Sequence, residues 1–231
     1  MITNEHVRDY LFSLEEELPQ YLSDLEKEAL RKNVPIIRRD VQSLLKYLLR
    51  KEKPEAVLEI GTAVGFSTLY MHEFAPSETH ITTIEKVEMR LKEARKNLAG
   101  KERITLIEED AGKALERLAA SSERFDLVFL DAAKGQYCSW LDDILKVLVP
   151  GGLLVTDNCL LEGSIAESKF SIERRDRTIH KRMREYLQVI THHDELETVI
   201  LPVGDGVAVS YRRCAGIPLK ERRERLIHEK A

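Results

Sequence analysis

Two apolar runs of the sequence end in side chains that could hold a metal ion. The run in "FDLVFLDAAKGQY" ends at Asp131, and the run in "GGLLVTDNCLLEG" ends at Asp157 and Asn158. If these runs are neighbouring strands, two carboxylates and an amide oxygen converge, and such hard ligands suit Mg²⁺ or Ca²⁺ better than Zn²⁺. So few protein ligands would leave positions open for a chelating substrate. Asp157 and Asn158 alone could form a simple turn, but their pairing with Asp131 favours the metal.

Lys134 follows Asp131 by three residues, which places a base next to the expected cation. A bound cation lowers the pKa of a substrate hydroxyl, and a partly buried lysine with a depressed pKa can take up its proton. The alternative is a surface lysine in a loop. The pattern predicts chemistry on an acceptor with two adjacent oxygens, one of them a hydroxyl.

The stretch "VLEIGTAVGFSTLY", residues 57–70, predicts a strand, a tight turn and the start of a helix. Ligands of doubly wound sheets bind beyond the carboxyl ends of the strands, where Gly61 would let one approach the backbone. Glu59 would lie beside it. The next two runs also end in acids, Glu85 and Asp110. A carboxylate at the second strand end suits a ribose diol, because it accepts hydrogen bonds from both hydroxyls.

The turn after this first strand is not suited to a phosphate. Thr62, Ala63 and Val64 stand where a pyrophosphate would need a glycine-lined helix N-terminus. The pattern therefore predicts a cofactor with a ribose and no phosphate, and S-adenosylmethionine meets both conditions. Its charged ammonium and sulfonium also suit several carboxylates, with Asp110 near the adenine. The alternative is an ordinary strand–turn–helix with surface acids.

From Pro35 to about Arg213 the sequence resembles the metal-dependent class I O-methyltransferases of the catechol and caffeoyl-CoA type. "LEIGTAVGFS" matches their cofactor loop, and the aspartate with the aspartate–asparagine pair matches their metal ligands. The resemblance implies an S-adenosylmethionine-dependent O-methyltransferase with Lys134 and Asp131 as catalytic residues. It also implies a homodimer, in which the acidic N-terminal helices would cover the symmetric partner. The alternative is that these helices only cap the sheet. The implied cofactor-binding residues are Ile37, Glu59, Gly61, Ser67, Glu85, Asp110, Ala111 and Asp131.

The methyl acceptor has three interpretations. Ala132 and Ala133 leave room beside the lysine, and "DAAKGQY", "TDN" and "VGDGVAVSYRR" look most like the bacterial tRNA 5-hydroxyuridine methyltransferases. That resemblance implies methylation of a wobble 5-hydroxyuridine, whose O4 and O5 could chelate Mg²⁺ as a catechol does, to 5-methoxyuridine. A small catechol or phenylpropanoid is the alternative. A non-catalytic adenosyl-binding module is a third, which the metal and base residues argue against.

A basic helical face would support the RNA interpretation. A helix is expected around residues 174–189, and four of its cations share one face. Such a face could hold phosphates, or it could be an ordinary solvated surface, because Glu173, Asp176 and Glu185 are interspersed. The four candidate RNA-binding residues are Arg174, Arg177, Lys181 and Arg184.

The elements that must position these residues alternate between short apolar runs and helical segments. This alternation predicts an α/β fold with a mostly parallel sheet and helices on both faces. The resemblance implies that it is a Rossmann-like class I methyltransferase fold with a seven-stranded sheet. Two strands around the Gly-Asp-Gly turn at Asp205 close the sheet, and Trp140 is expected in a helix core. We expect one domain over 1–231, with a helical extension at 1–52, the core at 53–213 and a tail at 214–231. Pro19 would divide the first two helices.

Composition narrows the class of protein further. The 231 residues carry a net charge of -4, which argues against indiscriminate nucleic-acid binding. No apolar run approaches the roughly 20 residues of a membrane span, and the first residues do not have the pattern of a signal peptide. The three cysteines share no metal-type spacing, so a reducing, cytoplasmic compartment is expected.

Overall fold

The structure, a computed structural model, describes residues 4–168 and 170–214. The expected terminal tail therefore lies outside the described residues except for Cys214. Within the described part of the chain, no helix has the length and apolar character needed to cross a membrane.

The described residues form one seven-stranded sheet in the order β3-β2-β1-β4-β5-β7-β6. The first five strands of this order pair in parallel, and β7 pairs antiparallel with both of its neighbours. The predicted fold class is therefore confirmed. The strands are β1 Ala56–Ile60, β2 His80–Glu85, β3 Ile104–Glu108, β4 Phe125–Leu130, β5 Leu148–Thr156, β6 Leu196–Leu201 and β7 Val207–Arg212.

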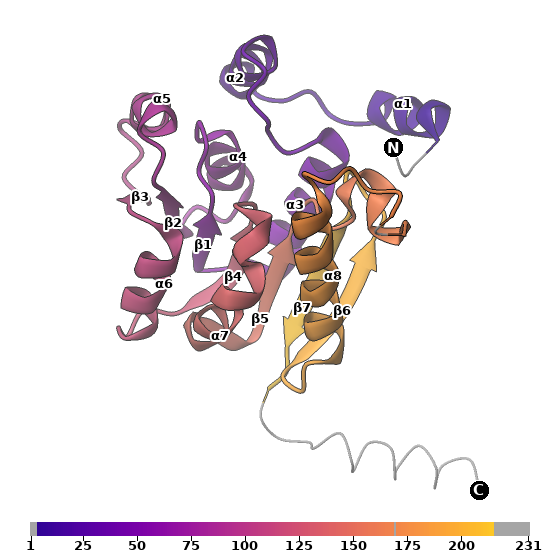
Figure 1. The fold of residues 1–231 in the computed structure, drawn as a ribbon. Helices are drawn as coiled ribbons and strands as arrows, with labels where there is room; N and C mark the ends of the chain where they lie inside the picture. The colour runs from indigo at the N-terminus through magenta and orange to yellow at the C-terminus, as the bar shows by residue number, and fades with distance from the viewer. Residues whose placement is uncertain (1–3, 169, 215–231) are drawn as a thin grey trace, which may run out of the picture.

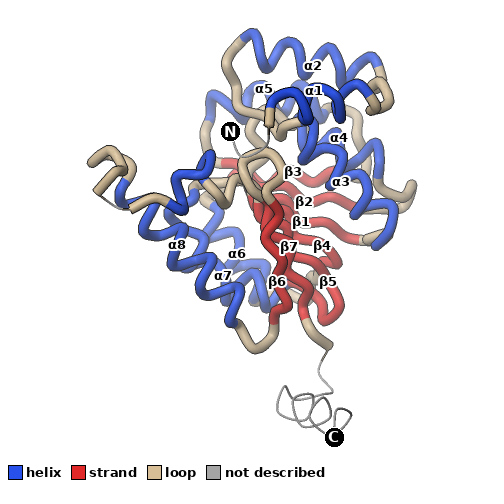
Figure 2. Tube along the Cα trace, turned by 90° about the vertical axis from the view of Figure 1, so that its right-hand side faces the viewer, coloured by secondary structure: helices blue, strands red, loops and turns tan. Residues whose placement is uncertain are grey.

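Helices cover both faces of the sheet, as Figures 1 and 2 show. One face packs against α2 to α5 and the other against α6 to α8, each through its own apolar cluster. The helices are α1 Glu5–Ser13, α2 Gln20–Arg31, α3 Arg39–Glu52, α4 Phe66–Phe74, α5 Glu88–Leu98, α6 Ala111–Ala119, α7 Tyr137–Val147 and α8 Arg177–His192, with short 3-10 helices η1 Lys134–Gln136 and η2 Leu161–Ala166. Pro19 is the N-cap residue of α2, so it divides the first two helices as predicted.

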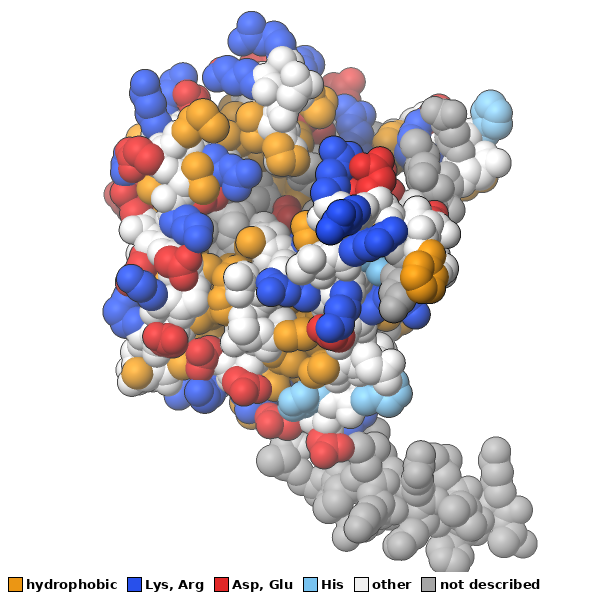
Figure 3. All heavy atoms as spheres, viewed as in Figure 1, with side chains coloured by type: hydrophobic (Ala, Val, Ile, Leu, Met, Phe, Trp, Pro, Cys, Tyr) orange, Lys and Arg blue, Asp and Glu red, His pale blue; other side chains and the backbone are white. Residues whose placement is uncertain are grey.

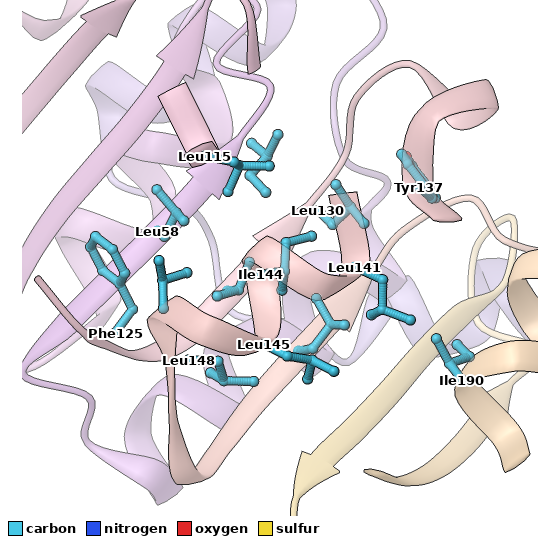
Figure 4. Packing of buried hydrophobic residues seen from close by; sticks show 14 of the residues in the cluster. Leu58, Leu115, Phe125, Leu130, Tyr137, Leu141, Ile144, Leu145, Leu148 and Ile190 are labelled. Atoms are coloured by element: carbon cyan, nitrogen blue, oxygen red, sulfur yellow. The ribbon is translucent and has the colours of Figure 1, made fainter. Parts of the chain in front are cut away.

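The apolar cluster under α6 to α8 packs the central strands of the sheet against these helices. Leu58 and Leu130 of the central strands are fully buried and pack with Leu115, Leu141 and Ile144 of the covering helices (Figure 4). Burying such side chains stabilises the fold by about 1.5–3 kcal/mol each. Central parallel strands that are apolar on both faces leave their polar residues at the carboxyl ends, which is where the site forms.

The structure corrects the predicted basic helical face. α8 begins at Arg177, so Arg174 precedes the helix and does not share its face. Arg177 donates from Nε to the Ile172 carbonyl at 3.0 Å, and Arg184 donates from Nη1 to the Ile165 carbonyl at 3.0 Å. Two of the four cations therefore tie down the segment before the helix. Lys181, 3.6 Å from Glu185, stays exposed on α8.

Candidate active site

A cavity of about 880 Å³ opens at the carboxyl ends of the parallel strands. Its position at the switch of strand order, where β1 lies between β2 and β4, is the usual ligand site of a doubly wound sheet. The cavity has both charged and apolar walls. Its titratable lining residues include Glu85, Asp110, Asp131, Asp205, Arg38, Lys86, Arg90 and Lys134.

Gly61 joins the cofactor loop to the predicted metal site. It lines the cavity with φ at +112°, and a Cβ there would lie 2.1 Å from the carbonyl oxygen of Asp131. The sequence suggested that this glycine makes room for a ligand. The structure shows that the chain after β4 already occupies the space beside it, so any larger residue would push against the backbone of Asp131.

Glu59 and Ser67 lie beneath the loop and are not among the cavity-lining residues. The Glu59 carboxylate is fully buried and accepts hydrogen bonds from the hydroxyls of Ser67, Thr68 and Thr83. Burial raises its pKa to about 7, against the lowering effect of these three donors. In the described structure Glu59 therefore ties β1 to β2 and to the start of α4. The cofactor contacts predicted for Glu59 and Ser67 remain predictions.

We expect Glu59 to make stability depend on pH around neutrality. A carboxyl whose folded-state pKa is raised from 4.5 to about 7 contributes stability fully below pH 4.5, and this is lost as the pH rises through 7. The loss amounts to about 3 kcal/mol for a shift of this size. Urea unfolding of the parent and of Glu59→Gln should therefore differ by a pH-dependent amount between pH 5 and 8. The control is Glu116→Gln, a change to an exposed acid on α6. If the stability difference between the parent and Glu59→Gln is as constant with pH as the difference between the parent and this control, the raised pKa assigned to Glu59 is wrong.

Glu85 holds the loops that follow β1 and β2. Its Oε1 accepts from the backbone N–H of Lys86 at 2.8 Å and of Val87 at 2.9 Å, and its Oε2 accepts from the N–H of Ala63 at 3.0 Å. Arg90 lies 3.7 Å from the same carboxylate. Glu85 also lines the cavity, and its contact with a ribose remains a prediction.

Replacing Glu85 with alanine is expected to weaken binding of S-adenosylmethionine by about 1–3 kcal/mol. The cause is the loss of charge-assisted hydrogen bonds to the ribose and of the three loop contacts. Isothermal calorimetry measures the change, with Glu88→Ala as the control because Glu88 is exposed on the neighbouring helix. Unchanged affinity in Glu85→Ala, or tight binding of NAD to the parent, would count against the cofactor assignment.

The other predicted cofactor residues lie at different depths. Asp110 is the N-cap residue of α6 and pairs with Lys86 at 2.9 Å, and this contact lowers the pKa of its carboxyl. Asp110 and Ala111 both line the cavity. Ile37 is buried in the apolar cluster and does not line the cavity, whereas its neighbours Ile36 and Arg38 do.

The structure brings the predicted metal ligands together. Asp131 and Asp157 follow adjacent strands, and the N–H of Asp157 donates to the Leu130 carbonyl at 3.0 Å. Asp157 is 1% exposed, and its Oδ1 accepts from the N–H of Asn158 at 2.6 Å. Burial raises the pKa of both carboxyls, and the negative charge of Asp131 raises that of Asp157 further. Two acids that follow adjacent strands, one buried and one at the cavity, favour a positive charge beside them.

A hard divalent cation fits this donor set. Among the described residues, no three His, Cys, Asp or Glu side chains are grouped as a metal site. The predicted ligands, the carboxylates of Asp131 and Asp157 and the amide oxygen of Asn158, include only two such side chains and so would not form a group of that kind. Asn158 has φ at 54°, a left-handed conformation that asparagine tolerates, and it lines the cavity with Asp131. Carboxylates and an amide oxygen are the ligands that Mg²⁺ prefers.

The sequence interpretation missed Asp205 as a site residue. It was expected in a hairpin turn, which it does occupy, but it is 7% exposed and lines the cavity. Its Oδ2 lies 3.9 Å from Nζ of Lys134, and its Oδ1 accepts from the N–H of Glu162. Lys134 starts the 3-10 helix η1, and its positive charge offsets part of the rise that burial causes in the pKa of Asp131. The signal available in the sequence was an acid fixed between two glycines.

Trp140 also differs from its prediction. It packs partly against the apolar cluster of α6 and α7, as expected, but it also lines the cavity. Its Nε1 would lie 3.2 Å from a Cβ added to Gly112, so the small residue leaves room for the indole. Trp140 therefore gives the cavity an aromatic wall on the side of Asp110.

Known proteins share both this fold and this sequence pattern. Residues 12–213 match the family model described as O-methyltransferase. A caffeoyl-CoA O-methyltransferase of Populus kitakamiensis is 27% identical over 190 residues, which cover 79% of each chain. A Staphylococcus aureus protein, assigned provisionally as a caffeoyl-CoA O-methyltransferase, has a crystal structure that matches with a TM-score of 0.83 and 28% identity, covering 90% of this chain and 100% of that one. An O-methyltransferase from Bacillus cereus, solved in complex with SAH, shares the fold at 20% identity and a TM-score of 0.78, covering 90% and 97%.

The fold and the cavity define a class I methyltransferase. The chain belongs to the O-methyltransferase family, because the family model matches most of its length. The enzyme class predicted from the sequence, an S-adenosylmethionine-dependent O-methyltransferase, is confirmed.

Proposed function

We propose that this enzyme transfers the methyl group of S-adenosylmethionine to one hydroxyl of an acceptor that carries two adjacent oxygens. The observation that supports the proposal is the meeting of Asp131, Asn158, Lys134 and Asp205 in one cavity with Asp157 buried behind them. The cofactor would lie toward Glu85 and Asp110, and the acceptor toward Lys134 and Asp205. The methyl donor and the metal ligands would thus lie on either side of Gly61, which packs against the backbone of Asp131.

The residues of this chain divide the chemistry between them. S-adenosylmethionine supplies an electrophilic methyl group, and a divalent cation supplies positive charge that favours ionisation of the acceptor hydroxyl. Asp131, Asp157 and Asn158 hold that charge in place. Lys134, in its neutral amine form, would accept the hydroxyl proton at Nζ, and Asp205, 3.9 Å away, holds the lysine at the cavity. Fixing both reactants in one cavity supplies much of the rate.

A small phenolic acceptor has the better support. The relatives include proteins described as caffeoyl-CoA O-methyltransferases. The cavity of about 880 Å³ has the apolar lining residues Pro35 and Ile36, which suit a flat ring. A catechol or phenylpropanoid would chelate the cation through its two adjacent oxygens.

A 5-hydroxyuridine of tRNA is the second candidate acceptor. The specific observation in its favour is the gathering of Lys and Arg side chains over the region of α8, seen in Figure 3. Arg175 and Lys181 are exposed there, with 78% and 77% of their side-chain surface accessible. Exposed cations next to an open cavity could hold RNA phosphates. Their pairing with Glu173, Asp176 and Glu185 reduces this positive charge.

One experiment separates the two acceptors. The purified protein is given labelled S-adenosylmethionine and Mg²⁺ with either a set of small vicinal diols or tRNA that contains 5-hydroxyuridine, and products are identified by mass spectrometry. The small-molecule proposal expects methylated diols and unchanged tRNA. Formation of 5-methoxyuridine, with binding that weakens steeply as salt is raised, would favour tRNA instead. Methylation of neither would overturn the proposed function.

The predicted homodimer is a separate proposal, which light scattering tests.

A further inference from the structure

The cavity has four lining cations, and each pairs with an acid. Three of the acids also line the cavity: Lys86 pairs with Asp110 at 2.9 Å, Arg90 approaches Glu85 at 3.7 Å, and Lys134 approaches Asp205 at 3.9 Å. These three pairs belong to the cofactor end or to proton transfer. The remaining cation is Arg38.

Arg38 differs because its partner lies outside the cavity. Its Nη2 lies 2.6 Å from Oε1 of Glu162, a residue that is absent from the lining set. The side chains of Arg38 and Glu162 are 41% and 65% exposed. Solvent screens such a pair, so it contributes little to stability and can open easily. Arg38 can therefore turn from Glu162 toward the cavity without uncovering a buried charge.

The backbone aims Arg38 at the acceptor end. The backbone of Arg38 is extended, with φ at -70° and ψ at 157°. Pro35, Ile36 and Arg38 line the cavity, whereas Ile37 is buried in the core. A Cβ on Gly204 would lie 3.8 Å from Cδ of Arg38, which puts the guanidinium stem against the turn that carries Asp205. That acid approaches the proposed base.

Glu162 is anchored to the same turn. Its N–H donates to Asp205, and Leu160 donates from its N–H to the Asp205 carbonyl at 2.9 Å. Leu161, Glu162 and Gly163 have φ of 50°, 54° and 92°, and this run of left-handed residues fixes the direction in which the Glu162 side chain leaves the loop. The carboxylate is thus held beside the turn, where it pairs with Arg38.

We propose that Arg38 is a specificity residue that binds an anionic group of the acceptor, a carboxylate or a phosphate, in exchange for Glu162. This inference rests on the proposed function. The anion takes the place of the Glu162 carboxylate, so the guanidinium keeps an anionic partner, and the released Glu162, whose side chain is 65% exposed, is solvated by water. A neutral acceptor gains nothing from Arg38, which stays with Glu162. Glu162 is then a competitor of the anion.

The test uses acceptors that differ only in charge. One pair is 3,4-dihydroxycinnamate and its amide, and the other is 5-hydroxyuridine 5′-monophosphate and the nucleoside. Arg38→Ala should raise KM for the anionic member roughly five- to twentyfold and leave kcat, and KM for the neutral member, nearly unchanged. This range is the loss of a charge-assisted hydrogen bond, reduced because the parent must first break the exposed Arg38–Glu162 pair. Glu162→Gln should lower KM for the anionic member alone. Whichever pair is turned over identifies the anion as carboxylate or phosphate.

The outcomes separate the two proposals. Arg95→Ala is the control, because Arg95 is 44% exposed, pairs with Glu88 and Glu108, and does not line the cavity. If Arg38→Ala changes KM equally for both members of a pair, Arg38 does not read acceptor charge and the inference is wrong, although the proposed function stands. If the parent protein methylates none of the four compounds but does methylate another diol or tRNA, the inference is wrong and the proposed function stands. If it methylates no diol and no tRNA, the proposed function fails and the inference fails with it.

Discussion

Replacing Asp131 or Asp157 with alanine is expected to reduce methyl transfer by about a thousandfold or more, because each change removes a ligand charge from a site with only three protein ligands. The rate should be measured at saturating S-adenosylmethionine with the acceptor that the parent uses. Excess chelator should inactivate the parent to the same degree, and Mg²⁺ should restore it. Asp142→Asn, a change to an exposed acid on α7, should leave the rate unchanged. Full activity of the parent in excess chelator would contradict the metal-dependent proposal.

Changes at the same two residues should also alter thermal stability, which can be measured without an acceptor. Without a cation, Asp131 and Asp157 are buried acids whose pKa values are raised by burial, and Asp157 is raised further by its neighbour's charge. The ionised pair therefore costs stability at pH 8, and Asp157→Asn should raise the Tm in chelator. Mg²⁺ should raise the Tm of the parent and not that of the variant. Equal shifts in both proteins would place the cation elsewhere.

Replacing Lys134 with methionine is expected to lower kcat by about 10²- to 10⁴-fold, the usual contribution of a positioned general base. Methionine keeps the length of the side chain and removes the amine. Affinity for S-adenosylmethionine should stay within about twofold, because Lys134 lies at the acceptor end of the cavity. Stopped single-turnover assays separate the chemical step from product release. Lys113→Met, on the exposed face of α6, serves as the control.

A small effect on kcat would require another base. If Lys134→Met lowered kcat by less than about threefold while the Asp131 variant remained inactive, the cation alone would ionise the acceptor, and the assignment of Lys134 as the base would be wrong. A rise in KM with kcat unchanged would make Lys134 a binding residue.

The order and type of the elements followed from the sequence alone. Apolar runs such as "FDLVFL" are too short for helices and apolar on both faces, which is typical of central parallel strands, and the segments between them had helical spacing. Because parallel strands end on one edge, the acids after them had to lie near one another. Glu85, Asp110 and Asp131 accordingly line one cavity. Helix boundaries were less determined, and α8 begins at Arg177, three residues later than expected.

Only the tertiary structure decided which of these side chains face the cavity. Ile37 lies between two lining residues, Ile36 and Arg38, and yet is buried in the core. Glu59, two residues before the lining residue Gly61, is also buried, and its carboxylate accepts from the hydroxyls of Ser67, Thr68 and Thr83. Asp205 and Glu162 reach the site through turns set by left-handed residues. The partners of Asp205 and Arg38 are 71 and 124 residues away, at Lys134 and Glu162. Local patterns determine elements, whereas contacts between distant segments depend on how the sheet packs them together.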